Sequence, residues 1–197
     1  MNVLLTGFEP FGGSDINSSW ETAVRVGQLS PDDVDVDVLQ LPVSFIRAGK
    51  HVRKALRDTM PDVLVMLGQR GRGQCIEIER ISVNLMDSSS SDNDGYCPLD
   101  QCIVPKGESA YFSNLPVKEL RDALLEKNIP ARVSNSAGLY VCNSTYYNAL
   151  DEIYEHKLPI RAVFVHLPKL SGDFPIDLLV KAVKTLIETL FSNGKNQ

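Results

Sequence analysis

The chain of 197 residues lacks the features that mark several large protein classes. It has no basic excess, since its formal net charge is -5, whereas a protein that binds nucleic-acid phosphates needs a basic face. No apolar run approaches the roughly 20 residues that a membrane helix requires. Residues 1–7 have no basic region and no long apolar region, so they predict a first strand rather than a signal peptide. We therefore expect neither a nucleic-acid partner nor a membrane partner.

Cysteine and histidine are also scarce, with four and three residues. The four cysteines show no C-x-x-C pair and no metal-ligand spacing with the histidines, so no metal site is expected. Without an export signal, the expected state of these cysteines is reduced, in the cytoplasm. Cys97 and Cys102 are close enough in sequence for a local disulfide as a minor alternative. The glycines of residues 71–73 match neither a P-loop nor a dinucleotide-binding motif, so they give only a weak indication of phosphate binding.

Short apolar runs alternate with longer amphipathic segments, which is typical of an α/β domain. With 43% hydrophobic residues, no repeat and no linker, we expect one domain over residues 1–197. Residues 68–107 are rich in Gly, Ser, Asn and Asp, and so long an irregular segment is usually functional. The expected strands lie at 3–5, 34–39, 62–67, 81–85, 131–134 and 161–166, and the expected helices at 20–27, 44–59, 115–127, 142–154 and 176–191.

The segment from Ser136 to Tyr146 carries the strongest functional signal. A strand ends near Asn135, small residues turn the chain, and a periodic helix begins at about Cys142. At a helix N-terminus, unsatisfied N–H groups and the helix dipole favour a thiolate over a thiol, and the same N–H groups can stabilise an oxyanion. Cys142 is therefore a candidate nucleophile. The alternative is a small buried residue between helix and sheet.

Two further residues are candidates for activating a thiol. His166 follows the apolar segment 162–165, and ligand sites in open α/β sheets gather at the carboxyl ends of strands. Glu79 follows the glycine-rich loop, and a carboxylate that binds a histidine fixes its tautomer and stabilises the imidazolium. The alternatives are a hydrogen-bonded core histidine and an exposed charge pair of Glu79 with Arg80. The other two histidines lie in polar helical segments and are expected to be solvated.

Ordered segments along most of the chain resemble the pyroglutamyl peptidase I family, also called pyrrolidone-carboxylate peptidases. These are cysteine peptidases with a Glu-Cys-His triad. Each segment alone is a weak signal, whereas the ordered set is specific for the family. The matching segments are 4–13, Asn17 with 19–21, 68–69, Glu79-Arg80 with Asn84, 92–95, 110–112, 115–118, 129–131, 136–138 with 141–143, and 164–168.

The resemblance implies a three-layer α/β/α sandwich around a twisted, mostly parallel mixed sheet, with no cofactor. It also implies hydrolysis of the amide bond after an N-terminal pyroglutamyl residue of a peptide. In that mechanism the Cys142 thiolate forms a thioester acyl-enzyme. His166, oriented by Glu79, protonates the leaving amine and later activates water. Family members often form dimers or tetramers, so a homo-oligomer is expected, with residues 107–116 as a candidate apolar interface.

The resemblance further implies a pocket for the pyroglutamyl ring. Because this lactam is flat and uncharged, its pocket needs apolar walls and a few amide partners. Two of the implied wall residues, Phe8 and Phe11, also fit ordinary core packing. The implied pocket residues are Phe8, Phe11, Tyr140 and Val141 as walls, with Asn17 and Gln69 as polar partners.

The chain departs from the family's pattern next to these positions. Ser89 stands where the family carries an arginine that is thought to help stabilise the transition state. Residues 71–73 read Gly-Arg-Gly where Gly-Gly-Arg is usual, and Ile78 replaces a proline. Residues 139–140 read Leu-Tyr where Thr-Phe is usual, and Ser144 replaces a common histidine. The triad residues remain, but their surroundings are changed.

Three outcomes fit these departures. In the first, the chain is a fully active peptidase in which Arg70 or Arg72 takes the place of the missing arginine. In the second, it is a slower peptidase or one with a shifted substrate. In the third, it keeps the fold as a binding protein for N-terminally blocked peptides and has lost turnover. Losing one donor to an oxyanion costs about 100- to 1,000-fold in rate. We favour an active peptidase because all three triad residues remain. A nucleoside phosphorylase on a related scaffold is a more distant alternative, disfavoured because no loop offers a convincing phosphate cradle.

Overall fold

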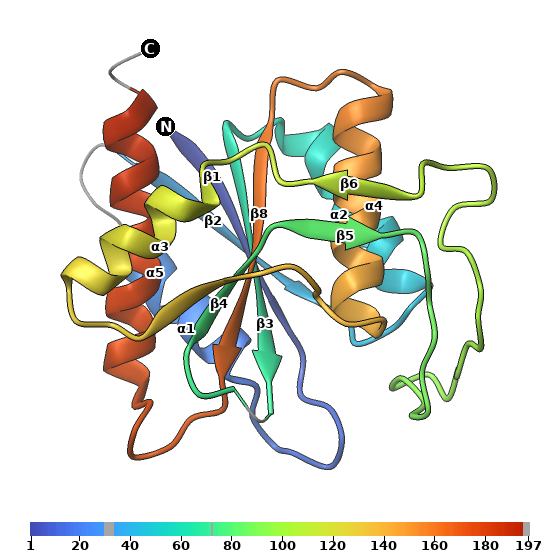
Figure 1. The fold of residues 1–197 in the computed structure, drawn as a ribbon, viewed down its shortest axis with the longest axis horizontal. Helices are drawn as coiled ribbons and strands as arrows, with labels where there is room; N and C mark the ends of the chain where they lie inside the picture. Colours follow the sequence, from blue (N-terminus) through green and yellow to red (C-terminus); the bar gives the residue numbers. More distant parts are fainter. Residues whose placement is uncertain (30–33, 72, 195–197) are drawn as a thin grey trace.

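The structure, a computed structural model, describes residues 1–29, 34–71 and 73–194. Within them, a six-stranded sheet with the order β2-β1-β3-β8-β4-β7 forms the centre of the molecule (Figure 1). Neighbouring strands run parallel except β4 and β8, which are antiparallel. The mostly parallel mixed sheet is therefore confirmed. The strands are β1 (Asn2–Phe8), β2 (Asp35–Leu41), β3 (Val63–Arg70), β4 (Ile76–Glu79), β7 (Ala131–Ser134) and β8 (Arg161–Pro168).

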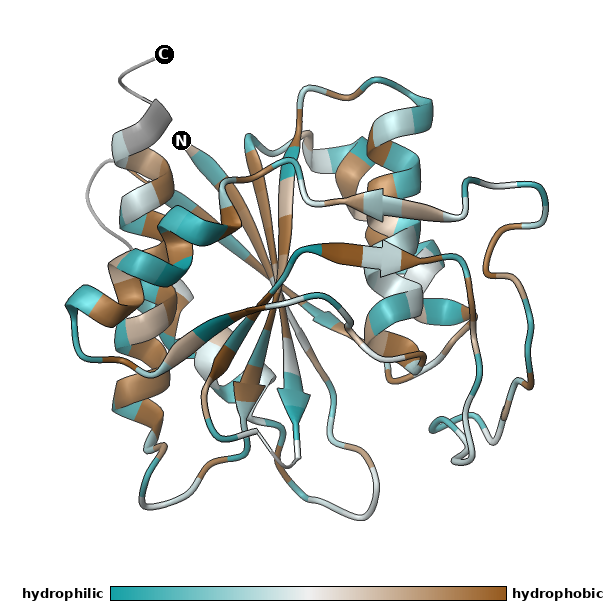
Figure 2. Cartoon of the chain, viewed as in Figure 1, coloured by the Kyte–Doolittle hydropathy of each residue, from teal (hydrophilic) through white to brown (hydrophobic). Residues whose placement is uncertain are grey.

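Helices cover both faces of this sheet in the described chain, which confirms the three-layer α/β/α arrangement (Figure 1). Each face has its own apolar core, and Figure 2 shows the apolar residues gathered on the strands and on the helix sides that face them. Because side chains alternate along a strand, Val65 joins the core under α5, whereas Leu64 joins the core under α4. The helices are α1 (Ser18–Gln28), α3 (Val117–Glu126) and α5 (Ile176–Gly194) on one face, and α2 (Arg47–Thr59) and α4 (Val141–Glu155) on the other.

Strand β4 corrects the prediction that residues 68–107 are irregular apart from 81–85. It pairs in parallel with β7 and antiparallel with β8. Its sequence, Ile-Glu-Ile-Glu, has the alternation of a half-exposed segment, yet all four side chains are buried. The pattern misleads because Glu77 and Glu79 are buried with cationic partners rather than exposed to water.

A second, two-stranded sheet lies against α4, formed by β5 (Ile81–Val83) and β6 (Ala110–Phe112). The predicted strand 81–85 is thus shorter, and β6 was not predicted. Helix α2 begins three residues later than predicted because the Ser44 hydroxyl accepts the Arg47 N–H and caps the preceding turn. Helix α4 begins at Val141, next to the predicted start at Cys142.

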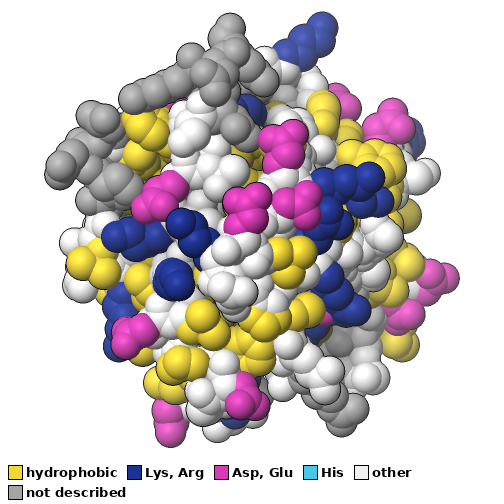
Figure 3. Space-filling view, turned by 60° about the vertical axis from the view of Figure 1, so that its left-hand side comes forward, with side chains coloured by type: hydrophobic (Ala, Val, Ile, Leu, Met, Phe, Trp, Pro, Cys, Tyr) yellow, Lys and Arg dark blue, Asp and Glu magenta, His cyan; other side chains and the backbone are white. Residues whose placement is uncertain are grey.

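Two further observations concern the cysteines and the helices. All four cysteines are free, so the disulfide considered for Cys97 and Cys102 is not formed. No helix in the described part of the chain is long and apolar enough to cross a membrane. On the side of the molecule turned forward in Figure 3, acidic and basic side chains are interspersed, and no basic patch extends across that face.

Candidate active site

A cavity of about 250 Å³ opens at the carboxyl ends of β1, β3 and β8. Such an edge is where open α/β sheets bind ligands. The cavity contains both Cys142 and His166 and all six residues predicted for the lactam pocket. Its lining consists of Phe8, Phe11, Asn17, Val43, Gln69, Arg70, Gly71, Ala137, Tyr140, Val141, Cys142 and His166.

Cys142 is the second residue of α4. The turn before the helix uses Gly138, whose φ of 78° is in the left-handed region that favours glycine. Tyr140 is extended and forms the N-cap, and its carbonyl accepts the Ser144 N–H at 3.2 Å. The first N–H groups of a helix have no partner within it. The thiol therefore lies beside unsatisfied donors, as the sequence predicted.

Gly68 has a role that the sequence analysis missed. A Cβ atom at this position of β3 would lie 3.0 Å from the Cys142 Sγ and 2.7 Å from the Phe164 ring. Only a residue without a side chain lets the thiol and the ring pack directly against β3. The signal in the sequence was a glycine at the end of an apolar strand, since such a glycine often marks a close approach of other groups.

His166 and Glu79 form a buried pair beneath the thiol. The His166 Nδ1 lies 2.7 Å from the Glu79 Oε1, and the two side chains are 4% and 0% exposed. Glu79 lies opposite Phe164 on the neighbouring strand β8, which places its carboxylate diagonally across from His166. An exposed charge pair of Glu79 with Arg80 is therefore the wrong interpretation of this segment.

The surroundings of His166 change its protonation. Burial alone lowers the pKa of His166, but hydrogen bonds and charge interactions with Cys142 and Glu79 outweigh burial and raise its pKa from 6.5 to about 9. An imidazolium between a thiolate and a carboxylate is the arrangement that activates cysteine nucleophiles. The raised pKa keeps His166 protonated at neutral pH, so the arrangement places a proton donor beside the Cys142 sulfur.

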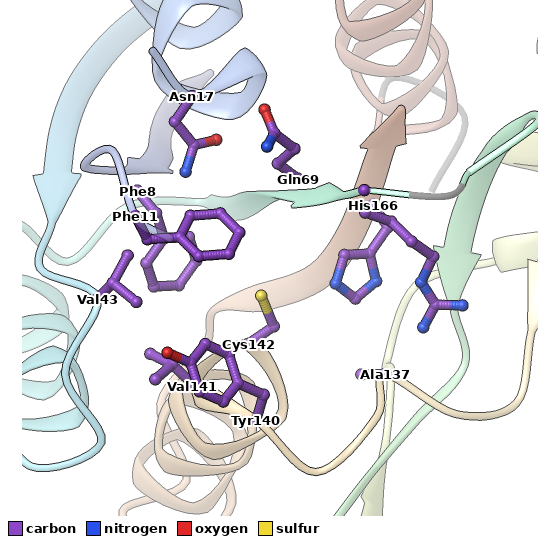
Figure 4. A pocket seen from close by; sticks show the side chains of 12 residues that line it. Phe8, Phe11, Asn17, Val43, Gln69, Ala137, Tyr140, Val141, Cys142 and His166 are labelled. Atoms are coloured by element: carbon purple, nitrogen blue, oxygen red, sulfur yellow. The ribbon is translucent and has the colours of Figure 1, made fainter. Parts of the chain in front are cut away.

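The cavity has an apolar end and a charged end. Phe8, Phe11 and Val43 lie on one side of the Cys142 sulfur, and His166 lies on the other (Figure 4). Phe8 is 2% exposed and also packs on Phe164, so it serves the core and the cavity together.

Tyr140 connects the apolar wall to a neighbouring loop. Its ring lies 6.5 Å from that of Phe11 and 5.2 Å from that of Phe45, measured between ring centroids. Its hydroxyl donates to the Ser91 carbonyl at 2.9 Å. The loop that contains Ser91 is thereby fixed beside the apolar end.

The two amide residues at the cavity hold the chain around it. Asn17 caps α1, accepting the Ser19 N–H at 3.0 Å, and its amide donates to the Glu9 carbonyl at 2.9 Å. The Gln69 Oε1 accepts the Ser18 N–H at 2.9 Å. Figure 4 shows the two amides side by side along one wall.

At the sequence position of the family arginine the chain carries Ser89. Ser89 is exposed and does not line the cavity. Arg70 does line it, but its guanidinium is held by Glu77, with Nη1 2.5 Å from the Glu77 Oε2. Arg72, the other candidate, lies outside the described residues.

One group of side chains in the described ranges has the composition of a metal site. Ligand atoms of Glu77, Glu79 and His166 lie within 4.8 Å of one another. Arg70 and Arg132 both form ion pairs with Glu77, and His166 pairs with Glu79. The negative charges of these carboxylates are therefore paired with Arg70, Arg132 and His166.

Comparison with known proteins identifies the family. The family model described as pyroglutamyl peptidase matches residues 1–189. The chain belongs to this family. The pyrrolidone-carboxylate peptidase of Thermococcus onnurineus is 39% identical to it, over 96% of the chain and 98% of the relative. That of Brevibacillus brevis is 34% identical, over 98% of the chain and 94% of the relative.

Solved structures of pyroglutamyl peptidases have the same fold as this chain. Pyroglutamyl peptidase I of Bacillus amyloliquefaciens is 34% identical and has a TM-score of 0.90, with 95% of each chain covered. A mutant pyrrolidone carboxyl peptidase of Pyrococcus furiosus is 35% identical with a TM-score of 0.93, covering 98% of this chain and 99% of that one. The relatives support the peptidase expectation rather than a nucleoside phosphorylase.

Proposed function

We propose that the chain removes the N-terminal pyroglutamyl residue from peptides by thiol catalysis. Cys142 is the nucleophile, His166 the general acid and base, and Glu79 the residue that orients His166. One observation carries this assignment. The His166 Nδ1 lies 2.7 Å from the Glu79 Oε1, and His166 and the Cys142 thiol line one largely apolar cavity. Membership of the pyroglutamyl peptidase family supports the same substrate.

The lactam ring of the substrate binds in the apolar end of the cavity. Phe11, Val43, Tyr140 and Val141 provide walls without charge, which suits a flat and uncharged ring. Asn17 and Gln69 stand at this end as amide groups for the ring's N–H and C=O. The scissile carbonyl then lies over Cys142, and the peptide amine lies on the side of His166.

Catalysis proceeds in two steps through a thioester. The Cys142 thiolate attacks the pyroglutamyl carbonyl, and the first N–H groups of α4 stabilise the oxyanion. The intermediate collapses as the C–N bond breaks and His166 gives its proton to the leaving nitrogen. Neutral His166 then takes a proton from water, whose oxygen attacks the thioester. Collapse releases pyroglutamate and restores the thiolate–imidazolium pair, with Glu79 charged throughout.

The test is hydrolysis of a fluorogenic pyroglutamyl amide by the wild type and by Cys142→Ala. We expect turnover to fall by at least about 1,000-fold in the variant, since removing a nucleophile removes the covalent route. Cys102→Ala is the matched control because Cys102 is exposed and lies outside the cavity. Turnover that survives in Cys142→Ala rules out this nucleophile. A wild type that binds a pyroglutamyl peptide without turnover supports the binding-protein alternative.

The cytoplasmic location and the homo-oligomer stay predictions. One observation supports an interface at residues 107–116, because Phe112 in this segment is 59% exposed. Light scattering of the purified protein at several concentrations measures the mass directly. A dimer or tetramer that is lost in Phe112→Ser supports this interface, and a monomer contradicts it.

A further inference from the structure

Strand β4 carries two buried carboxylates next to His166, and the mechanism uses only one of them. Glu77 and Glu79 are two residues apart, so their side chains leave the same face of the sheet. Both are buried, at 3% and 0% exposure. Glu77 pairs in register with His166 on β8, and ligand atoms of the three residues lie within 4.8 Å of one another.

The position of Glu79 depends on few contacts. Glu79 offers Oε1 to His166, while its Oε2 has no hydrogen-bond partner in the described part of the chain. A carboxylate orients a catalytic histidine only while its oxygen faces the imidazole. Buried carboxylates also need a partner of opposite charge, and a cation beside both of them can fix the strand that carries them.

Arg70 is that cation. Its Nη1 lies 2.5 Å from the Glu77 Oε2, its Nη2 lies 4.0 Å from the Glu79 Oε1, and Nη2 also donates to the Ser136 carbonyl at 3.2 Å. Ser136 belongs to the turn that leads into Cys142. A single guanidinium therefore connects the carboxylate strand β4 with the turn that carries the nucleophile.

We propose that Arg70, held by Glu77, is a positioning residue that fixes strand β4, and with it the carboxylate of Glu79, relative to the turn that carries Cys142. The inference rests on the proposed function and concerns residues outside the triad. It also changes the expectation that Arg70 replaces the family arginine, because its guanidinium is committed to Glu77 and Ser136. Among the described residues, the charged or titratable groups that interact with this pair of carboxylates are Arg70 from β3, Arg132 from β7, His166 from β8, Tyr146 from α4 and Cys75 from the loop before β4.

Arg132 provides a control within the same ion-pair group. It also binds Glu77, but its side chain is 62% exposed, against 31% for Arg70, and it does not line the cavity. Arg132→Met removes one cation from Glu77 and leaves the contacts of Arg70 with Glu79 and Ser136 in place. Arg70→Met removes the cation that reaches Glu79. The two variants make the same chemical change at different distances from the triad.

The experiment measures kcat and KM for a pyroglutamyl amide in the wild type, Arg70→Met, Arg70→Lys and Arg132→Met. For Arg70→Met we expect kcat to fall about 10- to 100-fold with KM nearly unchanged. Arg70→Lys should recover part of kcat because it keeps a cation beside Glu77, and Arg132→Met should lower kcat much less.

Two kinetic outcomes overturn the proposal. The first is a kcat of Arg70→Met equal to that of the wild type, and the second is an equal loss of kcat in Arg132→Met. The rate at which iodoacetamide alkylates Cys142 in folded Arg70→Met needs no turnover, so it separates this inference from the proposed function. We expect slower alkylation than in the wild type and in Arg132→Met, because the turn that carries the thiol is no longer fixed beside His166. An unchanged alkylation rate contradicts the positioning role even if the wild type hydrolyses no substrate.

Discussion

The apolar end and the charged end of the cavity meet at Cys142, but they are built in different ways. At the apolar end, Phe11, Val43 and Tyr140 form a wall through ring and aliphatic contacts. Such contacts have no strict direction, and they depend on volume and shape. At the charged end, His166 and Glu79 depend on one hydrogen bond of 2.7 Å within a buried site.

Because of this difference, substitutions at the two ends should affect KM and kcat differently. Apolar walls hold the lactam about equally in the ground state and in the transition state, so changes there should alter KM more than kcat. The charged end acts on groups whose charge develops only during the reaction, so changes there should alter kcat. Four predictions test this division.

The largest effect is expected at the charged end, from Glu79→Gln. Glutamine keeps the shape and an acceptor oxygen but lacks the charge that stabilises the imidazolium. By analogy with the loss of the aspartate charge in a serine protease triad, kcat should fall roughly 1,000- to 10,000-fold. Because the apolar end is intact, KM should change little.

Steady-state kinetics on a pyroglutamyl amide measure this prediction, with Glu155→Gln on the exposed end of α4 as the matched control. The reverse result, a raised KM with kcat retained, would show that Glu79 contributes to binding. It would contradict the assignment of binding to the apolar end and of rate to the charged end.

Gly68→Ala tests the point where the two ends meet. The added methyl group would lie 3.0 Å from the Cys142 Sγ and 2.7 Å from the Phe164 ring, so the thiol must shift. A displacement of a reacting group by about 1 Å costs roughly 100-fold in rate. We expect a loss of that order in kcat, together with slower alkylation of Cys142.

Gly71→Ala is the control for this substitution. Gly71 also lines the cavity, but among the described residues no atom would lie within 4 Å of a Cβ added there. The packing interpretation is wrong if Gly71→Ala and Gly68→Ala lose activity equally.

The third prediction concerns pH. Because the pKa of His166 is raised to about 9 in the folded chain, against about 6.5 in the unfolded chain, protonated His166 stabilises the fold. This contribution is complete below pH 6.5 and is lost as pH rises from 6.5 through 9. In urea unfolding, the wild type should therefore lose stability over this range more steeply than His166→Gln.

Cys142→Ala sharpens this prediction, because Cys142 makes the largest contribution that raises the pKa of His166. The NMR titration midpoint of His166 should fall in this variant, with His166→Gln identifying the resonance. A midpoint that stays near 9 would mean that Glu79 alone sets the charge of His166.

The strands and the helix start that carry this site could be predicted from local sequence, whereas the walls of the apolar end came from the family resemblance, which did not include Val43. Apolar runs predicted the buried strands that became β1, β3 and β8, and the turn before Cys142 placed the thiol at a helix start. These signals are local, since hydrophobic periodicity and small residues report on neighbours in the chain. His166 was found in the same way, as a polar residue near the end of an apolar strand.

The burial of Glu77 could not be predicted, because it depends on contacts between different strands. Alternating isoleucine and glutamate indicates a strand with one solvent-exposed face, so β4 itself had a sequence signal. Glu77 is nevertheless buried because Arg70 on β3 and Arg132 on β7 form ion pairs with it. Gly68, at the end of an apolar strand, indicated a close approach of another group but not which one, since Cys142 lies 74 residues further along the chain.

The smallest effect is expected at the apolar end, from Tyr140→Phe. The ring stays in the wall, and only the hydrogen bond from its hydroxyl to the Ser91 carbonyl is lost. One such bond contributes about 0.5–1.5 kcal/mol, which limits the rise in KM to roughly tenfold, and kcat should stay near its wild-type value. Tyr154→Phe is the control, because it also removes a hydroxyl bond to a backbone carbonyl, that of Phe112, outside the cavity. If Tyr140→Phe instead lowers kcat with KM unchanged, the loop held by Tyr140 influences the catalytic groups at the charged end, and the two ends of the cavity are structurally coupled.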